Sequence, residues 1–149
     1  MKLPIVADST SLIGLERIRQ LRLLPDLFEP FLIPPEVARE VGFSFDWLEV
    51  ETPVNETLVA SINSAVDRGE AEAIALAHEK GWRVLLDDRQ ARTVAKRMGL
   101  RIIGTVGVLI LAKQQSIIPA LKPLLNQLEA NNFYLSVDLR EEALRIVDE

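Results

Sequence analysis

Several carboxylates stand at the ends of apolar segments, or inside one, where a side chain is expected to be buried. Asp8 directly follows the apolar run KLPIVA, and the pair Asp87 and Asp88 directly follows WRVLL. Glu72 interrupts the otherwise apolar stretch AEAIALA. A buried carboxylate is costly unless a cation or hydrogen bonds compensate it, so these acids are the first candidates for chemistry.

The composition restricts which cation such acids would bind. The chain has no cysteine, and its one histidine is His78, so the usual sulfur and nitrogen ligands of zinc are almost missing. Carboxylate oxygens are hard ligands that suit Mg²⁺ or Mn²⁺. These ions activate water and stabilise the oxygens that attack and leave phosphorus, so the acids favour phosphoryl-group chemistry.

Glu70 and Glu72 differ in how much explanation they need. Asp67 and Glu70 have the spacing of a capping box with aspartate as the cap, which gives Glu70 a structural role at a helix N-terminus. Glu72 has no such explanation, and we expect it to hold a metal ion or to act in catalysis. The alternative is an ion pair between Glu72 and a buried arginine or lysine.

Asp8, Asp87 and Asp88 each have a structural alternative as well. Asp8 is a residue type that caps helices, and one of Asp87 and Asp88 would cap the helix that follows them. However, parallel strands end at one shared edge of the sheet, and ligands bind at that edge in open α/β sheets. We therefore expect these acids and Glu72 to meet in one pocket. Spacing alone leaves open which of Asp87 and Asp88 points inward.

Length and charge limit the class of protein. The chain of 149 residues is expected to form a single domain, 1–149. Its net charge of −5 disfavours binding of nucleic acid by phosphate neutralisation alone, but it is compatible with an enzyme whose acids are neutralised by bound cations. No apolar run reaches the roughly 18 residues that span a bilayer, and the N-terminal segment is too short for a signal peptide. We expect a cytoplasmic protein with no membrane contact.

The elements that must position the acids alternate between short strands and helices. The stretch QLRLLPDLFEPFLIPP is interrupted by prolines and contributes one of the strands. Strands are expected at 2–7, 30–34, 82–86 and 101–103, with an edge strand near 47–52 and a last short strand after residue 132. Helices are expected at 11–19, 35–42, 55–69, 69–81, 87–100, 104–116 and 119–131, and at the C-terminus. This alternation predicts an α/β fold with three layers, α/β/α, around a mostly parallel sheet of about four to five strands.

Five stretches make the chain resemble the PIN-domain superfamily, the ribonuclease fold of VapC-type toxins. They are IVADSTSLIGL (5–15), PPEVAREV (34–41), RGEAEAIALA (68–77), VLLDDRQAR (84–92) and GTVGVLILAK (104–113). The chain is most similar to a bacterial and archaeal branch with GEAEAI and GTxGVLxxAK motifs. Each stretch is modest alone, but the ordered set covers most of the chain and is fairly specific.

The resemblance implies three or four acids around one or two Mg²⁺ or Mn²⁺ ions. Glu40 enters through the resemblance alone, since helical spacing makes it a surface residue, and Glu72 stands where the family commonly has an aspartate. Carried over to this sequence, the catalytic acids are Asp8, Glu40, Glu72 and Asp88, the metal ligands are Asp8, Glu72, Asp88 and Asp87, and the supporting residues are Ser9 and Thr10.

The resemblance also implies an activity and partners. The expected activity is endoribonucleolytic hydrolysis of RNA phosphodiester bonds, by the toxin of a toxin–antitoxin pair whose partner is an antitoxin protein. PIN proteins often dimerise, and we expect a homodimer. An apolar stripe near the C-terminus would dock on the domain itself or on a second copy; it consists of Leu139, Ala143, Leu144 and Val147. The alternative is a non-catalytic PIN-like module that binds a partner protein, which the acidic net charge favours.

Overall fold

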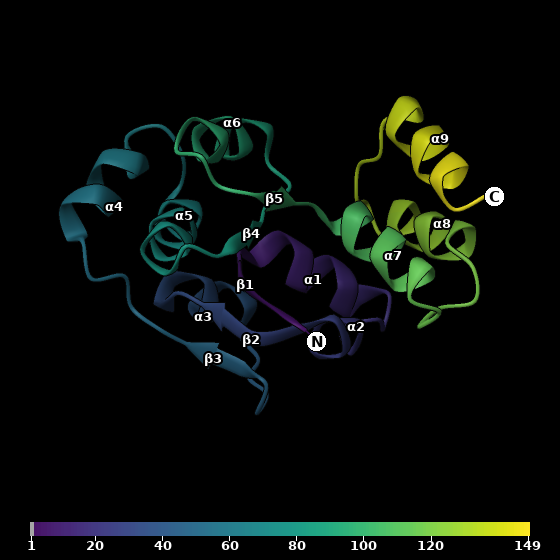
Figure 1. The fold of residues 1–149 in the computed structure, drawn as a ribbon, viewed down its shortest axis with the longest axis horizontal. Helices are drawn as coiled ribbons and strands as arrows, with labels where there is room; N and C mark the ends of the chain where they lie inside the picture. Colours follow the sequence, from purple (N-terminus) through teal and green to yellow (C-terminus); the bar gives the residue numbers. More distant parts are fainter. Residues whose placement is uncertain (1) are drawn as a thin grey trace.

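A parallel sheet lies at the centre of the molecule. The structure is a computed structural model that describes residues 2–149, and in this part of the chain five parallel strands form one sheet in the order β3-β2-β1-β4-β5 (Figure 1). The strands are β1 (Leu3–Ala7), β2 (Phe28–Ile33), β3 (Leu48–Val50), β4 (Arg83–Leu85) and β5 (Ile102–Ile103). The predicted α/β class with a parallel sheet is therefore confirmed, and the predicted edge strand is β3.

Helices cover both faces of the sheet. They are α1 (Ser9–Arg17), α2 (Leu23–Leu27), α3 (Pro35–Val41), α4 (Glu56–Asn63), α5 (Arg68–Lys80), α6 (Arg89–Arg97), α7 (Thr105–Gln114), α8 (Lys122–Ala130) and α9 (Val137–Ile146). Figure 1 shows α4, α5 and α6 at one end of the molecule and α7, α8 and α9 at the other. Within residues 2–149, no helix has both the length and the apolar character needed to cross a membrane.

Alternating side chains of β1 divide the interior into two cores. Ile5 and Ala7 pack into the core formed with α1, α2, α7 and α8, whereas Val6 packs into the core formed with α4, α5 and α6. A strand buried on both faces is expected to be apolar throughout, as β1 is in its second half. This arrangement gives the three layers that the sequence predicts.

β1 is the point at which the order of the strands reverses. It pairs with β2 on one side and with β4 on the other. The helix after β1 belongs to one core, and α6, which follows β4, belongs to the opposite core. In sheets of this kind a crevice forms outside the carboxyl ends of the two strands, because their connections leave in opposite directions.

The helix α5 is internal and has a well-defined start. Asp67 and Glu70 form a capping box, in which the Asp67 side chain accepts from the Glu70 N–H and the Glu70 side chain accepts from the Asp67 N–H. All residues from Gly69 to Ala77 are buried, as expected for a helix that is apolar nearly all round. Gly81 ends the helix with a φ of 69°, a left-handed conformation that glycine adopts without a steric penalty.

Several details of the chain path differ from the prediction; the helix expected at 55–69, for example, is α4 and ends at Asn63. The strand expected after residue 132 is wrong: residues 131–136 form a loop, and the Ser136 side chain accepts from the Leu139 N–H to begin α9. The stretch before β2, interrupted by Pro25, contains the short helix α2, which the sequence analysis did not predict. Three of its five residues are leucines buried in the core, so packing stabilises a helix that the proline disfavours.

The apolar stripe of α9 docks on the domain itself. Ala143 is buried, and Leu144 and Val147 pack against the core that contains α7 and α8. Leu139 remains 45% exposed. Three of the four residues of the stripe therefore have an intramolecular partner, and the homodimer stays a prediction.

The internal position of α5 leads to a stability prediction. Leu76 is fully buried, so Leu76→Ala should lower the free energy of unfolding by about 2–5 kcal/mol, through lost burial and a residual cavity. Leu3→Ala is the matched control, since Leu3 is 49% exposed and its loss should change stability by about 0.5 kcal/mol or less. Urea denaturation measures both, and equal effects would contradict the placement of α5 in the core.

Candidate functional site

Two strand ends bring acids to one edge of the sheet. Ala7 at the end of β1 pairs with Leu85 at the end of β4, and the Asp8 N–H donates to the Leu85 carbonyl over 3.1 Å. Asp8 directly follows β1 and Asp87 lies two residues after the end of β4, so both acids stand at the same edge of neighbouring strands. The expected meeting of these strand ends is what the structure shows.

Asp8 is the most deeply buried of these acids. Only 4% of it is exposed, and although it occupies the N-cap position of α1, its side chain makes no capping hydrogen bond. Burial is the main reason that its pKa is raised to about 7; the backbone N–H of Ser9 acts in the opposite direction, and the charges of Asp67, Glu40 and Asp87 raise it again. Capping does not account for Asp8.

Glu40 lies beside Asp8 because Gly69 has no side chain. A Cβ built on Gly69 would collide with Glu40 Oε1 and would stand 3.5 Å from Asp8 Oδ1. The pKa of Glu40 is raised, first by burial of its carboxyl and then by the charge of Asp67, while a hydrogen bond with the Ser9 side chain acts in the opposite direction. Glu40 is an exposed residue, as its helical spacing predicts, yet its carboxylate reaches the acids at the strand ends.

Asp87 and Asp88 have different roles. Asp87 Oδ2 lies 2.9 Å from Ser11 Oγ and 2.6 Å from Thr105 Oγ1, and Asp87 Oδ1 accepts from the Thr105 N–H over 2.9 Å. Asp87 thereby connects the first turns of α1 and α7. Asp88 is exposed and caps α6 by accepting from the Ala91 N–H with one oxygen. Both acids line the same groove.

Glu70 belongs to the cluster of acids around Asp8, whereas the sequence predicted only a capping role for it. It forms the predicted capping box with Asp67, and it is also only 8% exposed. Its pKa is raised to about 7, mainly by burial and then by the charges of Asp67, Asp8 and Asp88. Its position in the first turn of a buried helix could have indicated a role beyond capping, because a glutamate that only caps a helix does not need to be buried.

Glu72 does not join the cluster, which corrects its predicted place in this pocket. Its carboxylate accepts from Arg68 Nε over 2.7 Å and from the Glu36 N–H over 3.1 Å. Residues two positions apart on an α-helix point roughly 200° apart, so Glu70 and Glu72 cannot face the same pocket. The structure contains the ion pair with an arginine that was the alternative, although the Arg68 side chain is 39% exposed and not buried.

Of the two supporting residues predicted, Ser9 lies beside the acids and Thr10 does not contact them. Thr10 lines the groove but is exposed, and no described hydrogen bond joins its side chain to Asp8. Ser9 is buried beside Asp8 and Glu40. Its N–H acts to lower the pKa of Asp8, and its side chain acts to lower the pKa of Glu40. The hydroxyls that order the site are those of Ser11 and Thr105, which lie 2.9 Å apart against Asp87. Because Ser11 and Thr105 are far apart in the sequence, the sequence did not predict this contact.

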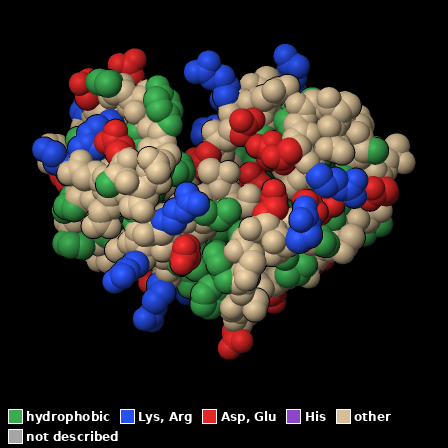
Figure 2. All heavy atoms as spheres, turned by 180° about the vertical axis from the view of Figure 1, so that it is seen from behind, with side chains coloured by type: hydrophobic (Ala, Val, Ile, Leu, Met, Phe, Trp, Pro, Cys, Tyr) green, Lys and Arg blue, Asp and Glu red, His purple; other side chains and the backbone are tan. Residues whose placement is uncertain are grey.

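An open groove of about 990 Å³ leads away from the acids. Asp67, Glu70, Asp87 and Asp88 line it at one side, and residues of α7, the loop 131–136 and α9 line the other. Figure 2, which shows the molecule from behind, has Asp and Glu side chains gathered near the middle of that face. The groove is large enough for a segment of a polymeric ligand.

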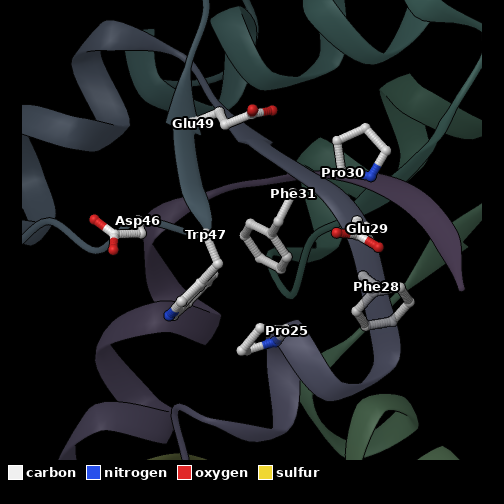
Figure 3. Close-up of a pocket in the computed structure, with 8 residues that line it drawn as sticks. All are labelled: Pro25, Phe28, Glu29, Pro30, Phe31, Asp46, Trp47 and Glu49. Atoms are coloured by element: carbon white, nitrogen blue, oxygen red, sulfur yellow. The ribbon is translucent and has the colours of Figure 1, made fainter.

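A second cavity lies elsewhere on the sheet (Figure 3). It has a volume of about 260 Å³ and is lined by Phe28 and Glu29 at the start of β2 and by Trp47 directly before β3. In Figure 3 the Phe31 ring faces Trp47, and their centroids are 5.4 Å apart. Because the strands are parallel, their starts lie at the edge opposite Asp8. This cavity is separate from the acid cluster.

The cluster has the donor chemistry for a hard divalent cation, but its side chains are not arranged as a finished cage. Within residues 2–149, no group of three His, Asp or Glu side chains stands ready to enclose an ion. Asp8 and Glu70 are buried, whereas Glu40, Asp67 and Asp88 are exposed, and Asp67 and Asp88 each use one oxygen to cap a helix. Binding would therefore need the exposed carboxylates to turn towards the buried ones.

The raised pKa of Asp8 predicts how stability depends on pH in the presence of a chelator. A carboxyl whose pKa is near 7 when folded and about 3.9 when unfolded favours the fold at low pH, and this contribution is lost as the pH rises from about 4 through 7. The melting temperature of Asp8→Asn should therefore fall less over this range than that of the natural chain. Asp46→Asn, at the second cavity, is the control; a natural chain whose melting temperature is flat between these pH values would contradict the prediction.

Comparison with known proteins identifies the family of this chain. A family model described as a PIN domain matches residues 4–149, which is nearly the whole chain. No curated protein matches the chain. The match includes both strand ends, the capping box of α5 and the Ser11–Asp87–Thr105 contact. The chain belongs to the PIN-domain family, whose members are generally nucleases that use divalent metal ions.

Proposed function

We propose that this protein is an endoribonuclease that depends on Mg²⁺ or Mn²⁺ and acts at the acid cluster. The observation that carries the proposal is Asp8, a carboxylate that is 4% exposed, caps no helix and is surrounded by other acids. Such an arrangement is unfavourable for the isolated chain and becomes favourable when a cation is bound. Family membership supports nuclease chemistry in general.

The residues proposed to hold the cation are Asp8 and acids whose carboxylates lie near Asp8 or near Glu70. Glu70 is held by the capping box, and Glu40 reaches the cluster across Gly69. Asp88 uses one oxygen to cap α6 and retains the other for a ligand. A divalent ion bound there would supply Lewis-acid chemistry, lowering the pKa of a water molecule and stabilising charge on phosphate oxygens.

Asp87 and Glu72 are proposed to position the site. Asp87 keeps the N-terminus of α7 beside α1 through Ser11 and Thr105. Glu72 accepts from the Glu36 N–H in the first turn of α3, the helix that carries Glu40. Each acid therefore acts through the placement of a helix and not through the ligand.

The biological setting proposed is that of a toxin paired with an antitoxin protein, with the active form a homodimer. The support is the similarity of the sequence motifs to those of VapC-type toxins, together with the exposed Val137, Leu139 and Ile146 of α9. A small DNA-binding or disordered protein encoded directly beside this chain would support the pairing. Light scattering that gives the mass of one chain would contradict the dimer.

A second candidate function is a non-catalytic module that binds a partner protein. It is favoured by the finding that no ready-made group of three metal ligands exists among residues 2–149. Calorimetry with Mn²⁺ separates the two functions. Binding in the micromolar range that is lost in Asp8→Asn supports the nuclease, whereas no heat of binding supports the module.

Asp8→Asn should abolish metal-dependent cleavage of RNA. The amide keeps the volume of the side chain but removes the charge that holds a cation, so the rate should fall by at least about 100-fold. Asp46→Asn should leave the rate unchanged, because Asp46 lies at the second cavity. Cleavage of several single-stranded and structured RNAs with Mg²⁺ and Mn²⁺ measures this. Intact RNA with the natural chain, or undiminished cleavage by Asp8→Asn, would overturn the proposal.

Glu70→Gln and Glu72→Gln form a matched pair two residues apart on α5. Glutamine preserves the capping box, so Glu70→Gln should keep the fold and still lower the cleavage rate by about 100-fold or more. Glu72→Gln weakens the bond to Arg68, so it should cost about 1–3 kcal/mol of stability while cleavage stays within about 10-fold. The reverse pattern would place Glu72 at the metal after all.

A further inference from the structure

The groove beside the acid cluster has two chemically different sides. The side formed by α5 and α6 carries Asp67, Glu70, Asp88 and two arginines, Arg89 and Arg92. The opposite side includes Val106 and Ile110 of α7, together with the aromatic loop before α9, and Ile102 and Ile103 of β5 lie between the two sides. A ligand that fills both sides must be charged along one edge and apolar and flat along the other. A nucleic-acid strand has this character, with phosphates on one side and bases on the other.

Arg89 and Arg92 are cations with little other use in the fold. Neither forms an ion pair with another residue of the 2–149 segment. Arg92 Nη1 lies 3.5 Å from the Leu86 carbonyl, and a Cβ on Gly104 would stand 2.9 Å from Arg92 Nη1. Arg92 is thus held at the rim of the groove by its neighbours. Both arginines are available to phosphates that enter it.

Tyr134 stands on the opposite side, between two anchored residues. Leu135 is 7% exposed, and Phe133 is partly buried against Gly14, whose added Cβ would lie 3.2 Å from the Phe133 ring. Tyr134 itself is 84% exposed and lines the groove. The loop is therefore fixed on both sides of a large aromatic ring that contributes nothing to the core. Such exposure is costly for the isolated chain and is useful where a flat ligand covers the ring.

We propose that Tyr134 stacks against a base of the RNA strand and so determines how the strand enters the acid cluster, with its phosphates on Arg89 and Arg92. This inference rests on the proposed function and adds a specificity residue to it. Stacking needs an unpaired base with an accessible face, so the ring selects single-stranded segments. A second copy of this chain is the competing occupant, because Val137 and Leu139 are also exposed nearby. Arg89, Arg92 and the divalent ion proposed at the acid cluster offer positive charge to phosphates, and this favours an RNA strand as the occupant.

Binding in an inactive background tests the proposal without relying on cleavage. The probe is a short, fluorescein-labelled, single-stranded oligoribonucleotide, and its binding is measured by fluorescence anisotropy. The Asp8→Asn protein is the parent into which the other substitutions are introduced. Adding Tyr134→Ala should weaken binding by about 5-fold to 150-fold, the range for loss of one base–aromatic stack. Tyr134→Phe should bind within about 2-fold of the parent, because the ring remains. Phe45→Ala is the matched control, since Phe45 is an exposed aromatic residue away from the groove.

Two further measurements separate stacking from a change in structure or charge. A set of oligonucleotides is prepared, each with one abasic site at a different position. The parent should bind one or two of them more weakly than the intact oligonucleotide, whereas Tyr134→Ala should bind those same ones as well as it binds the intact oligonucleotide. The salt dependence should be unchanged by Tyr134→Ala and reduced by Arg89→Gln, by a slope of about 0.7 for one lost contact to a single strand. Thermal melting confirms that each variant folds.

The outcomes distinguish this inference from the function on which it rests. If the parent binds RNA and Tyr134→Ala binds equally well, the stacking role is wrong and the nuclease proposal is untouched. If neither Asp8→Asn nor the natural chain binds or cleaves RNA, the proposed function fails and this inference fails with it. If Tyr134→Ala converts a dimer to a single chain in sedimentation without altering RNA affinity, the ring belongs to an interface between copies.

Discussion

The concentration of negative charge at the carboxyl edge of the sheet is the constraint around which the site is built. Asp8 and Glu70 are both nearly inaccessible, and Glu40, Asp67, Asp87 and Asp88 are close enough to appear among the charges that raise their pKa values. Like charges in a low-dielectric region repel strongly. Burial first, and this repulsion second, raise the pKa of the two buried carboxyls to about 7, and a bound cation would offset both effects.

Helix N-termini supply the fixed part of the compensation. Asp8 stands at the N-cap of α1, Asp67 at that of α5 and Asp88 at that of α6, while Asp87 accepts from the first N–H of α7. The positive end of each helix dipole favours a nearby anion by about 0.3–1 kcal/mol, so four helix starts offset part of the repulsion. The fold brings these helix starts together because α1 and α6 follow adjacent parallel strands. Capping and function are therefore compatible uses of the same acids, and a cap at a strand end is no argument against a site.

The crevice at β1 also explains why the groove has two unlike sides. The connections after β1 and β4 leave towards opposite faces of the sheet, so α5 and α6 meet the groove from one side, and α7 and the loop before α9 meet it from the other. Carboxylates and two arginines occupy the first side, and aliphatic and aromatic residues occupy the second. Glu72 joins α5 to α3, which pack in different cores, and Asp87 joins α1 to α7 within one core.

The sequence by itself determined the α/β class, the parallel sheet, the order of most helices and the capping box of α5, because these depend on local periodicity and on residues three or four positions apart. It also identified Asp8, Asp87 and Asp88, since an acid after a buried strand is visible along the chain. Only the tertiary structure decided that Glu70 and not Glu72 faces Asp8, that Gly69 admits Glu40, and that Ser11 meets Thr105. Those contacts depend on the rotation of α5 about its axis and on which helices lie side by side. The rotation of α5 and the neighbours of each helix are set by residues that are distant in sequence, so no pattern within one segment predicts these contacts.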